Sequence, residues 1–147
     1  MSGAVGRNGV SEKSREGDLC TPQGLYPLGF AFGTEPVEGL HLEYRVVNAD
    51  CYWVDDPASA YYNQWVESDT VQWDSAEHLI DYPQAYRYAV VIGYNMAPVV
   101  PYAGSAIFLH CQTGDATAGC VAIPEEEMLY VLRWLDSDQH PMIWIAG

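Results

Sequence analysis

One stretch, from Ala106 to Pro124, most constrains how this chain can fold. It reads Ala-Ile-Phe-Leu-His-Cys-Gln-Thr-Gly-Asp-Ala-Thr-Ala-Gly-Cys-Val-Ala-Ile-Pro. The apolar residues leading to His110 predict a buried strand, and the small residues after it predict a loop that returns to Cys120. A thiol nucleophile needs a base within hydrogen-bond reach and backbone N–H groups directed at the developing oxyanion. The stretch therefore predicts Cys120 as nucleophile and His110 as general base, in an enzyme of acyl transfer on peptides.

The residues next to the thiol are small, so they leave backbone donors uncovered. The predicted oxyanion hole combines the N–H of Cys120 with that of Gly119 or Ala118. Thr117 and Ala118 are also candidates for contacting substrate. Because Cys111 is a poor partner for the neighbouring histidine, a backbone carbonyl is expected to orient the imidazole.

The composition is that of one globular domain with a β-rich fold. A chain of 147 residues is long enough to bury a core, and 11 Tyr with 5 Trp favour strands. Six Lys and Arg against 20 Asp and Glu give a net charge of −14, which disfavours nucleic acid and anionic membrane surfaces as partners. No apolar run approaches the roughly 20 residues of a membrane-spanning helix, so no transmembrane segment is expected.

Alternating or continuous apolar patterns predict strands over residues 25–32, 41–47, 86–94, 105–110 and 142–146. Pro27 and Gly29 interrupt the first of these, which predicts an edge strand or a bulge. The strand over 86–94 is β-branched and aromatic and should be central. Residues 1–19 are polar and rich in glycine, and they are interpreted as a loop-like N-terminal arm that is solvated or frayed.

Two or three short helices are expected within this mainly β domain, which has a β-sandwich or barrel-like form and spans residues 1–147. Pro124 opens the clearest helix, whose apolar residues fall on one stripe: Met128, Val131, Leu132 and Leu135. Asp56 and Pro57 predict a short helix over residues 58–64. Residues 74–77, Asp-Ser-Ala-Glu, have the form of a capping box before a helical turn that reaches Ile80.

The four cysteines leave their pairing open. Cys20, Cys51, Cys111 and Cys120 allow one bridge with free thiols, two bridges or none. A metal interpretation would use His110, Cys111 and Cys120, with Cys20 or Cys51 as a fourth ligand. No Cys-x-x-Cys or His-x-x-x-His spacing supports it, so no metal and no cofactor are expected.

Three segments, in order, resemble the L,D-transpeptidase catalytic domain (YkuD-type) family, whose members crosslink or trim bacterial peptidoglycan. Residues 21–24, Thr-Pro-Gln-Gly, match the family's Thr-Pro-x-Gly turn. Residues 107–110 match the strand that ends in its catalytic histidine, and residues 117–121, Thr-Ala-Gly-Cys-Val, match its nucleophile motif. Two positions depart from the family pattern, because Ala118 and Ala122 stand where a histidine and an Arg or Asn are usual.

The resemblance implies an L,D-transpeptidase acting on peptidoglycan stem peptides in cell-wall biogenesis and the maintenance of cell shape. Cys120 would form a thioester with release of D-alanine, helped by an imidazole that raises its thiolate fraction, and an amine would resolve it. Two alternatives stay open: an L,D-carboxypeptidase that uses water, and a catalytically silent peptidoglycan-binding module, which Ala118 and Ala122 motivate.

The resemblance also implies an exported protein of the periplasm or cell envelope, expected to be a monomer. Residues 1–9 contain no apolar signal core. Either the protein is cytoplasmic or an export signal has been removed, and the loop-like start favours the second interpretation.

Overall fold

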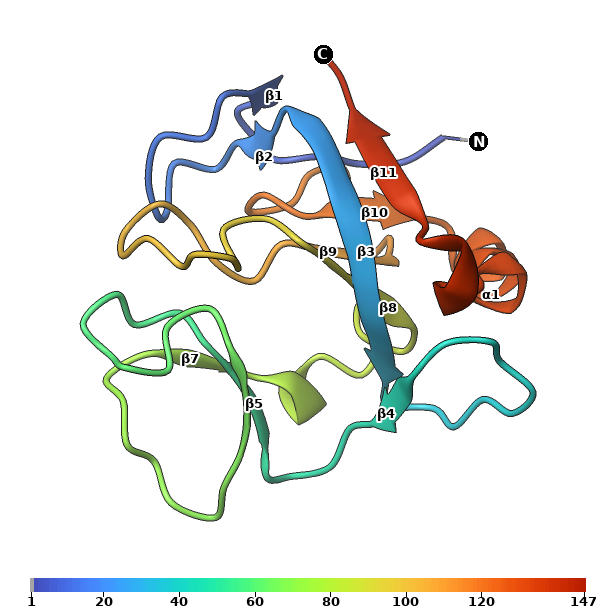
Figure 1. Ribbon diagram of the computed structural model, residues 1–147, viewed down its shortest axis with the longest axis horizontal. Coiled ribbons are helices and arrows are strands. Elements are labelled where there is room, and N and C mark those ends of the chain that lie inside the picture. The colour runs from blue at the N-terminus through green and yellow to red at the C-terminus, as the bar shows by residue number, and fades with distance from the viewer. Residues whose placement is uncertain (1) are drawn as a thin grey trace.

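The computed structural model describes residues 2–147, and its main element is a six-stranded sheet (Figure 1). Its strands follow the order β10-β9-β8-β3-β11, with β4 beside β3. The central position expected of the strand within residues 86–94 is confirmed, because β8 pairs with β9 on one side and β3 on the other. The bounds are β3 (Gly24–Gly33), β4 (Tyr44–Val46), β8 (Ala89–Ile92), β9 (Phe108–Cys111), β10 (Val121–Ile123) and β11 (Met142–Ile145).

Two smaller sheets and one α-helix complete the described chain. A three-stranded sheet has the order β6-β5-β7, from β5 (Cys51–Val54), β6 (Trp65–Glu67) and β7 (Ala76–His78). A two-stranded parallel sheet joins β1 (Val10–Ser11) to β2 (Thr21–Pro22). The helix is α1 (Glu125–Trp134), and two 3-10 turns are η1 (Leu79–Asp81) and η2 (Ser137–Gln139). The mainly β fold expected from the sequence is confirmed.

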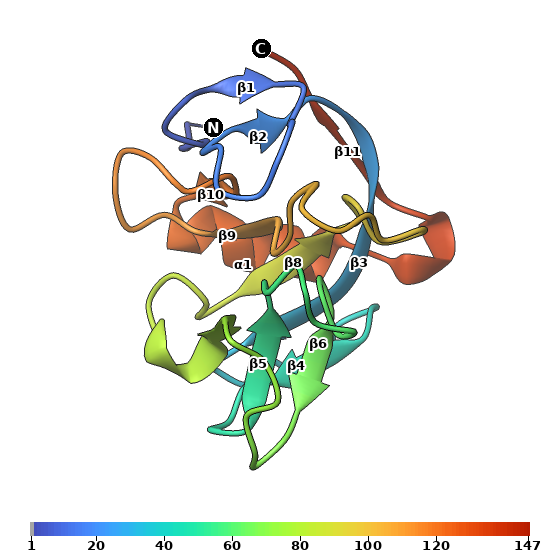
Figure 2. The same ribbon diagram turned by 90° about the vertical axis from the view of Figure 1, so that its left-hand side faces the viewer.

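The large sheet separates two hydrophobic cores, because successive side chains of a strand point to opposite faces. On β8, Val90 and Ile92 enter one core while Ala89 and Val91 enter the other. The first core is closed by α1 through a buried stripe: Met128, Leu132 and Leu135. Each such side chain contributes about 1.5–3 kcal/mol when fully buried. The second core is closed by the β6-β5-β7 sheet, which lies away from α1 in both views (Figures 1 and 2).

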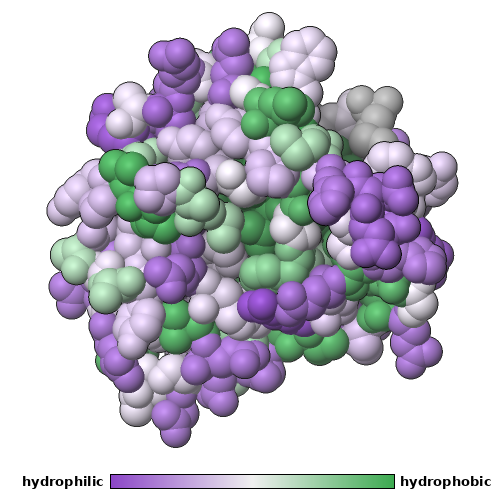
Figure 3. Space-filling view, viewed as in Figure 1, coloured by the Kyte–Doolittle hydropathy of each residue, from purple (hydrophilic) through white to green (hydrophobic). Residues whose placement is uncertain are grey.

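The strand containing Pro27 is bulged and is not an edge. Its pairing register with β8 shifts between Leu28 and Ala31, and the strand has neighbours on both sides. Pro27 lacks an N–H donor, but its carbonyl still accepts the Gly93 N–H at 2.8 Å, and a proline is tolerated beside a bulge. On the face seen in Figure 3, hydrophobic residues gather toward the middle and hydrophilic residues around the rim.

Two of the expected short helices take other forms. Residues 58–64 are a series of turns: the Asp56 carboxylate accepts the Ala58 N–H at 3.0 Å, as expected of a cap. The turns end at Asn63, whose φ is 58°, a left-handed value that a helix does not contain. The expected capping box at residues 74–77 is wrong, because Ala76 pairs with Val54 and Glu77 with Trp53 in the ladder of β7 with β5. Only η1 is helical there.

The N-terminal segment is not a frayed arm, because it is hydrogen-bonded to the domain, although residues such as Arg7 and Glu12 remain exposed. Ala4 is buried and exchanges two backbone hydrogen bonds with Ala122 of β10, at 2.7 and 2.8 Å. The Thr117 N–H donates to the Val5 carbonyl at 2.9 Å. The segment therefore braces the loop that ends at Cys120.

Candidate active site

Cys120 is the last residue before β10, and its thiol is buried. Sγ donates to the Ala106 carbonyl at 3.2 Å and accepts the Phe108 N–H at 3.4 Å. Burial raises the pKa of the thiol to about 12, and the Glu77 carboxylate adds to this increase. The resting group is therefore a neutral thiol, which differs from the thiolate that the sequence led us to expect.

His110 lies on β9, on the same face of the sheet as Phe108 and the second core. Its Nδ1 lies 2.8 Å from the Cys111 carbonyl oxygen. A carbonyl can only accept, so Nδ1 carries the proton and Nε2 carries the lone pair. Burial lowers the pKa of the imidazole. His110 is thus a neutral base oriented by a backbone carbonyl, as its sequence surroundings indicated.

Cys120 and His110 both line one hollow of about 160 Å³, together with Thr117 and Ala118. A second hollow, of about 130 Å³, lies beside the same thiol and is bounded by Lys13 and Glu16, among others. Three residues line both hollows: Glu77, Ala118 and Cys120. The nucleophile candidate therefore stands between two small spaces that substrate groups can enter.

In the loop before Cys120, the backbone N–H groups that are free to bind an oxyanion differ in part from those predicted. The Gly119 N–H already donates to Thr117 Oγ1 at 3.1 Å, so Gly119 is not a free oxyanion donor. In the part of the chain that the structure describes, the N–H groups of Ala118 and Cys120 have no hydrogen-bond partner. Gly119 is needed for another reason: its φ is 150°, and a Cβ there would lie 3.1 Å from the Cys20 carbonyl oxygen.

Two threonine hydroxyls hold the carbonyl of Cys120. Thr117 Oγ1 donates to it at 2.7 Å and Thr21 Oγ1 at 3.3 Å. Thr21 also accepts the Gly6 N–H at 2.7 Å. Thr21 was predicted only as part of a turn, and its place at the site was not predicted. The threonine in the Thr-Pro-x-Gly turn was the signal that could have found it.

A strained residue supports the thiol from the other side. Ala106 has a φ of 54°, which is uncommon for a residue other than glycine. Its N–H donates to Asn63 Oδ1 at 3.1 Å, and this oxygen also accepts Trp53 Nε1–H at 2.9 Å. The buried Asn63 amide therefore holds the backbone of Ala106, whose carbonyl accepts the Cys120 thiol.

A buried ion pair closes the second hollow. The Lys13 ammonium binds the Asp18 carboxylate, and the two side chains are only 3% and 7% exposed. Lys13 also donates to the Cys20 carbonyl at 3.2 Å, and its charge opposes the increase in the pKa of Cys120. Burial would raise the pKa of Asp18, but the Lys13 ammonium and three backbone N–H groups that donate to the carboxylate keep it well below its usual range; the donors belong to Cys20, Ser14 and Arg15.

Glu77 and Tyr86 form a second polar pair at the site that the sequence analysis did not identify. The Tyr86 hydroxyl donates to Glu77 Oε2 at 2.6 Å. The Tyr86 ring meets the His110 ring edge-on, with centroids 5.5 Å apart. No pattern in the sequence indicated this role, because Glu77 matched the last position of a capping box.

The remaining cysteines lie elsewhere, and all four thiols are free. Cys111 packs in the core under α1, whereas Cys120 belongs to the core on the opposite face of the sheet. Within residues 2–147, no group of three or more His, Cys, Asp or Glu side chains is placed to hold a metal ion. The side chains of His110, Cys111 and Cys120, which a metal interpretation of the sequence would need together, are divided between the two faces of the sheet.

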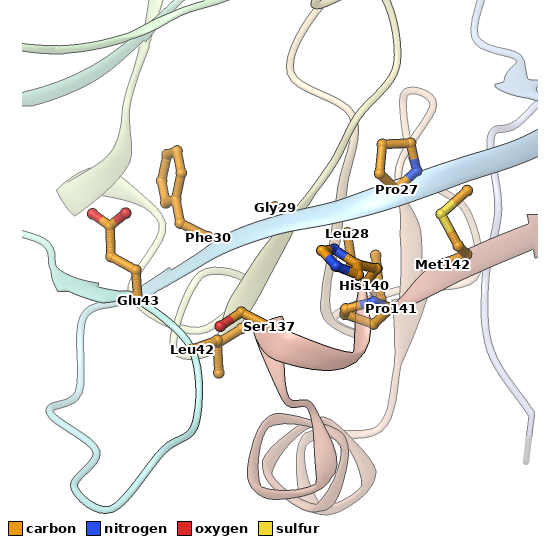
Figure 4. A pocket seen from close by; sticks show the side chains of 10 residues that line it. All are labelled: Pro27, Leu28, Gly29, Phe30, Leu42, Glu43, Ser137, His140, Pro141 and Met142. Carbon is orange, nitrogen blue, oxygen red and sulfur yellow. The ribbon is translucent and has the colours of Figure 1, made fainter.

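A separate hollow of about 320 Å³ lies along β3 and the start of β11 (Figure 4). Its lining includes Phe30, Glu43 and His140, and it contains none of the candidate catalytic residues. In Figure 4 the Phe30 ring and the Glu43 carboxylate lie toward one end and Met142 toward the other.

Comparisons with known proteins give one match. The family model described as the L,D-transpeptidase catalytic domain (YkuD) matches residues 2–143. No significant match was found among curated proteins or among solved structures. Among the described helices, none is both long and apolar enough to cross a membrane.

Proposed function

The chain belongs to the L,D-transpeptidase catalytic domain (YkuD) family, and from this we propose that it performs cysteine-dependent acyl transfer on peptidoglycan stem peptides. One observation carries the proposal: Cys120 and a neutral His110 line the same hollow. Unengaged N–H groups of Ala118 and Cys120 lie on the loop beside it. A nucleophile, a base and two oxyanion donors are the groups that acyl transfer requires.

In the first step, the neutral thiol turns from the Ala106 carbonyl toward the shared hollow. His110 Nε2 takes its proton while sulfur attacks the carbonyl carbon of the L-centre residue. The oxyanion is held by the two free N–H groups, and one such donor is worth about 10²–10³ in rate. The C–N bond then breaks, the imidazolium gives its proton to the leaving D-alanine nitrogen, and a thioester on Cys120 remains.

In the second step, the amine of a neighbouring stem attacks the thioester carbonyl. The C–S bond breaks, and the sulfur recovers a proton through His110. The product is a crosslinked peptide and a free thiol. We also propose that the protein acts at the cell envelope, where peptidoglycan lies, as a monomer in cell-wall biogenesis.

The test incubates the protein with a tetrapeptide stem, with and without a second stem that carries a free side-chain amine. We expect D-alanine release in both tubes and a crosslinked dimer only with the amine. Tripeptide alone in both tubes would assign the protein as an L,D-carboxypeptidase. If neither tube releases D-alanine, the proposed catalysis is rejected, and the remaining alternative is a catalytically silent peptidoglycan-binding module.

A further inference from the structure

We propose that Glu77 is a third catalytic residue of this site, the base that takes a proton from the incoming acceptor amine. This inference rests on the acyl transfer proposed above. It concerns only the second step, because acylation is served by Cys120 and His110.

Glu77 reaches the thiol from a different sheet than His110 does. It lies on β7 of the three-stranded sheet, whereas His110 lies on β9 of the large sheet. Glu77 lines both hollows beside Cys120, and the only other residues to do so are Ala118 and Cys120. A molecule that approaches the thioester through either hollow therefore meets Glu77.

The carboxyl group is held at one oxygen and available at the other. Oε2 accepts the Tyr86 hydroxyl at 2.6 Å, and Tyr86 is itself buried against His110. Elsewhere in residues 2–147 no group hydrogen-bonds to Oε1. The fixed oxygen orients the side chain, and Oε1 is left to receive an N–H from a ligand.

Proton counting requires a second base. A side-chain amine has a pKa of about 10.4 and arrives as an ammonium. It loses two protons when it becomes an amide nitrogen. His110 carries one of them to the departing sulfur, which leaves one proton without an acceptor. Water needs no such help, since one of its protons goes to sulfur and the new carboxylic acid releases the other to solvent.

The charges around Glu77 suit a base that meets an ammonium. Burial raises the pKa of its carboxyl to about 7, with Asp55 and Glu16 acting in the same direction and the Tyr86 hydrogen bond against it. A base works best with a pKa near the operating pH. The titratable groups that face it come from several elements: Asp55 after β5, Lys13 and Glu16 from the N-terminal segment, Tyr82 and Tyr86 before β8, His110 on β9 and Cys120 before β10.

In the second step, the two protons that the ammonium loses go to two different bases. The Glu77 carboxylate takes one proton from the ammonium, and the neutral nitrogen attacks the thioester carbonyl carbon. His110 removes the second proton as the N–C bond forms, the C–S bond breaks, and His110 protonates the sulfur. Glu77 then releases its proton to water. No oxidant, reductant or metal enters.

The test compares wild type, Glu77→Gln and a matched control, Glu67→Gln. Gln keeps an oxygen that accepts the Tyr86 hydroxyl, and Glu67 lies on β6 of the same sheet, outside both hollows. With a tetrapeptide stem alone, D-alanine release should stay within about 3-fold of wild type in the Glu67→Gln control, and the D-alanine release of Glu77→Gln measured in the same way is the reference for its acylation step. With the second stem as acceptor, crosslinking should fall about 100-fold in Glu77→Gln only.

Two further readouts separate a base from a merely structural group. Hydroxylamine is already neutral at neutral pH, so it should resolve the thioester equally fast in wild type and Glu77→Gln. With the stem amine, the wild-type rate should level off above about pH 7, whereas the Glu77→Gln rate should keep rising about tenfold per pH unit as free amine accumulates.

Equal crosslinking by wild type and Glu77→Gln would overturn the assignment. Equal losses with hydroxylamine and with the stem amine would do the same. If Glu77→Gln does not fold, the wild-type profile alone decides, because a continued tenfold rise per unit above about pH 8 contradicts a base of this pKa. Failure of the proposed function is distinguishable, since it would abolish D-alanine release in wild type itself.

Discussion

At the scale of single residues, burial keeps both the Cys120 thiol and the His110 imidazole neutral in this structure. The types and the order of Cys120 and His110 in the sequence were enough to predict a nucleophile and a base. The sequence did not predict their protonation states, because these depend on burial by distant segments: the pKa of the thiol is raised and that of the imidazole lowered. Thr21 was missed for a similar reason, because Cys120 lies far from it in the sequence, whereas Glu77 was missed because it matched the last position of a capping box.

The neutral His110 gives a pH prediction. The base must be unprotonated to act, and burial lowers the pKa of His110 below its ordinary value near 6.5. The acidic limb of the acylation rate should therefore fall below about pH 6.5. Rates of D-alanine release measured across pH check this, with His110→Asn expected to lose about 10²–10⁴ in rate. An acidic limb above the ordinary histidine value would contradict a buried, neutral base.

At the scale of elements, local patterns succeeded where one segment decides its own structure. Helix α1 formed where an apolar stripe with a 3.6-residue period followed Pro124. Residues 74–77, Asp-Ser-Ala-Glu, do not begin a helix, because part of this segment forms strand β7 and pairs with β5: Ala76 pairs with Val54. Pairing across about twenty residues of chain overrode the local cap, and no single-segment pattern shows this.

Strand β2 is linked to the nucleophile loop by one hydroxyl, which makes a second prediction. Thr21→Val keeps the shape but leaves the buried Gly6 N–H without an acceptor. We expect a loss of about 1–3 kcal/mol in the free energy of unfolding, together with slower acylation, because the Cys120 carbonyl loses a donor. Urea denaturation measures the first effect.

The control for this variant is Thr34→Val. Its hydroxyl donates to the Pro83 carbonyl at 3.1 Å in an exposed position, where water replaces the bond. Equal stability of the Thr21→Val and Thr34→Val proteins would show that the Thr21 hydroxyl does not hold the loop.

At the scale of the whole molecule, the two faces of the large sheet have different roles. One face packs on α1, and the other, with the three-stranded sheet, carries the site (Figure 2). The N-terminal segment closes that site through Ala4, Gly6 and the pair of Lys13 with Asp18. The sequence predicted the mainly β class but not this closure, since a polar, glycine-rich segment has no apolar pattern to indicate where it binds.

The Lys13–Asp18 pair gives a prediction on stability. Lys13→Met leaves a buried carboxylate unpaired and should cost about 3–5 kcal/mol, part of which Lys13→Met/Asp18→Asn should recover. The pKa of Asp18 is depressed in the folded state, so its stabilisation is present above its unfolded value near 3.9 and is lost as pH falls below it. Urea midpoints at acidic and neutral pH measure this.

The control is Arg87→Met, because Arg87 and Glu125 pair at the surface with 42% and 48% exposure. The urea midpoint of Arg87→Met should equal that of wild type. A Lys13→Met midpoint equally unchanged would mean that the N-terminal segment is not held by this pair.

The central claim is that Cys120 is the nucleophile, and intact-protein mass after exposure to a carbapenem-type β-lactam tests it most directly. The strained ring amide is opened by the thiol, so the whole antibiotic remains attached as a thioester. We predict one adduct per wild-type chain and none on Cys120→Ala, with Cys111→Ala, a buried thiol on the other face of the sheet, modified like wild type. An unmodified wild-type protein, or an equal adduct on Cys120→Ala, would contradict the account.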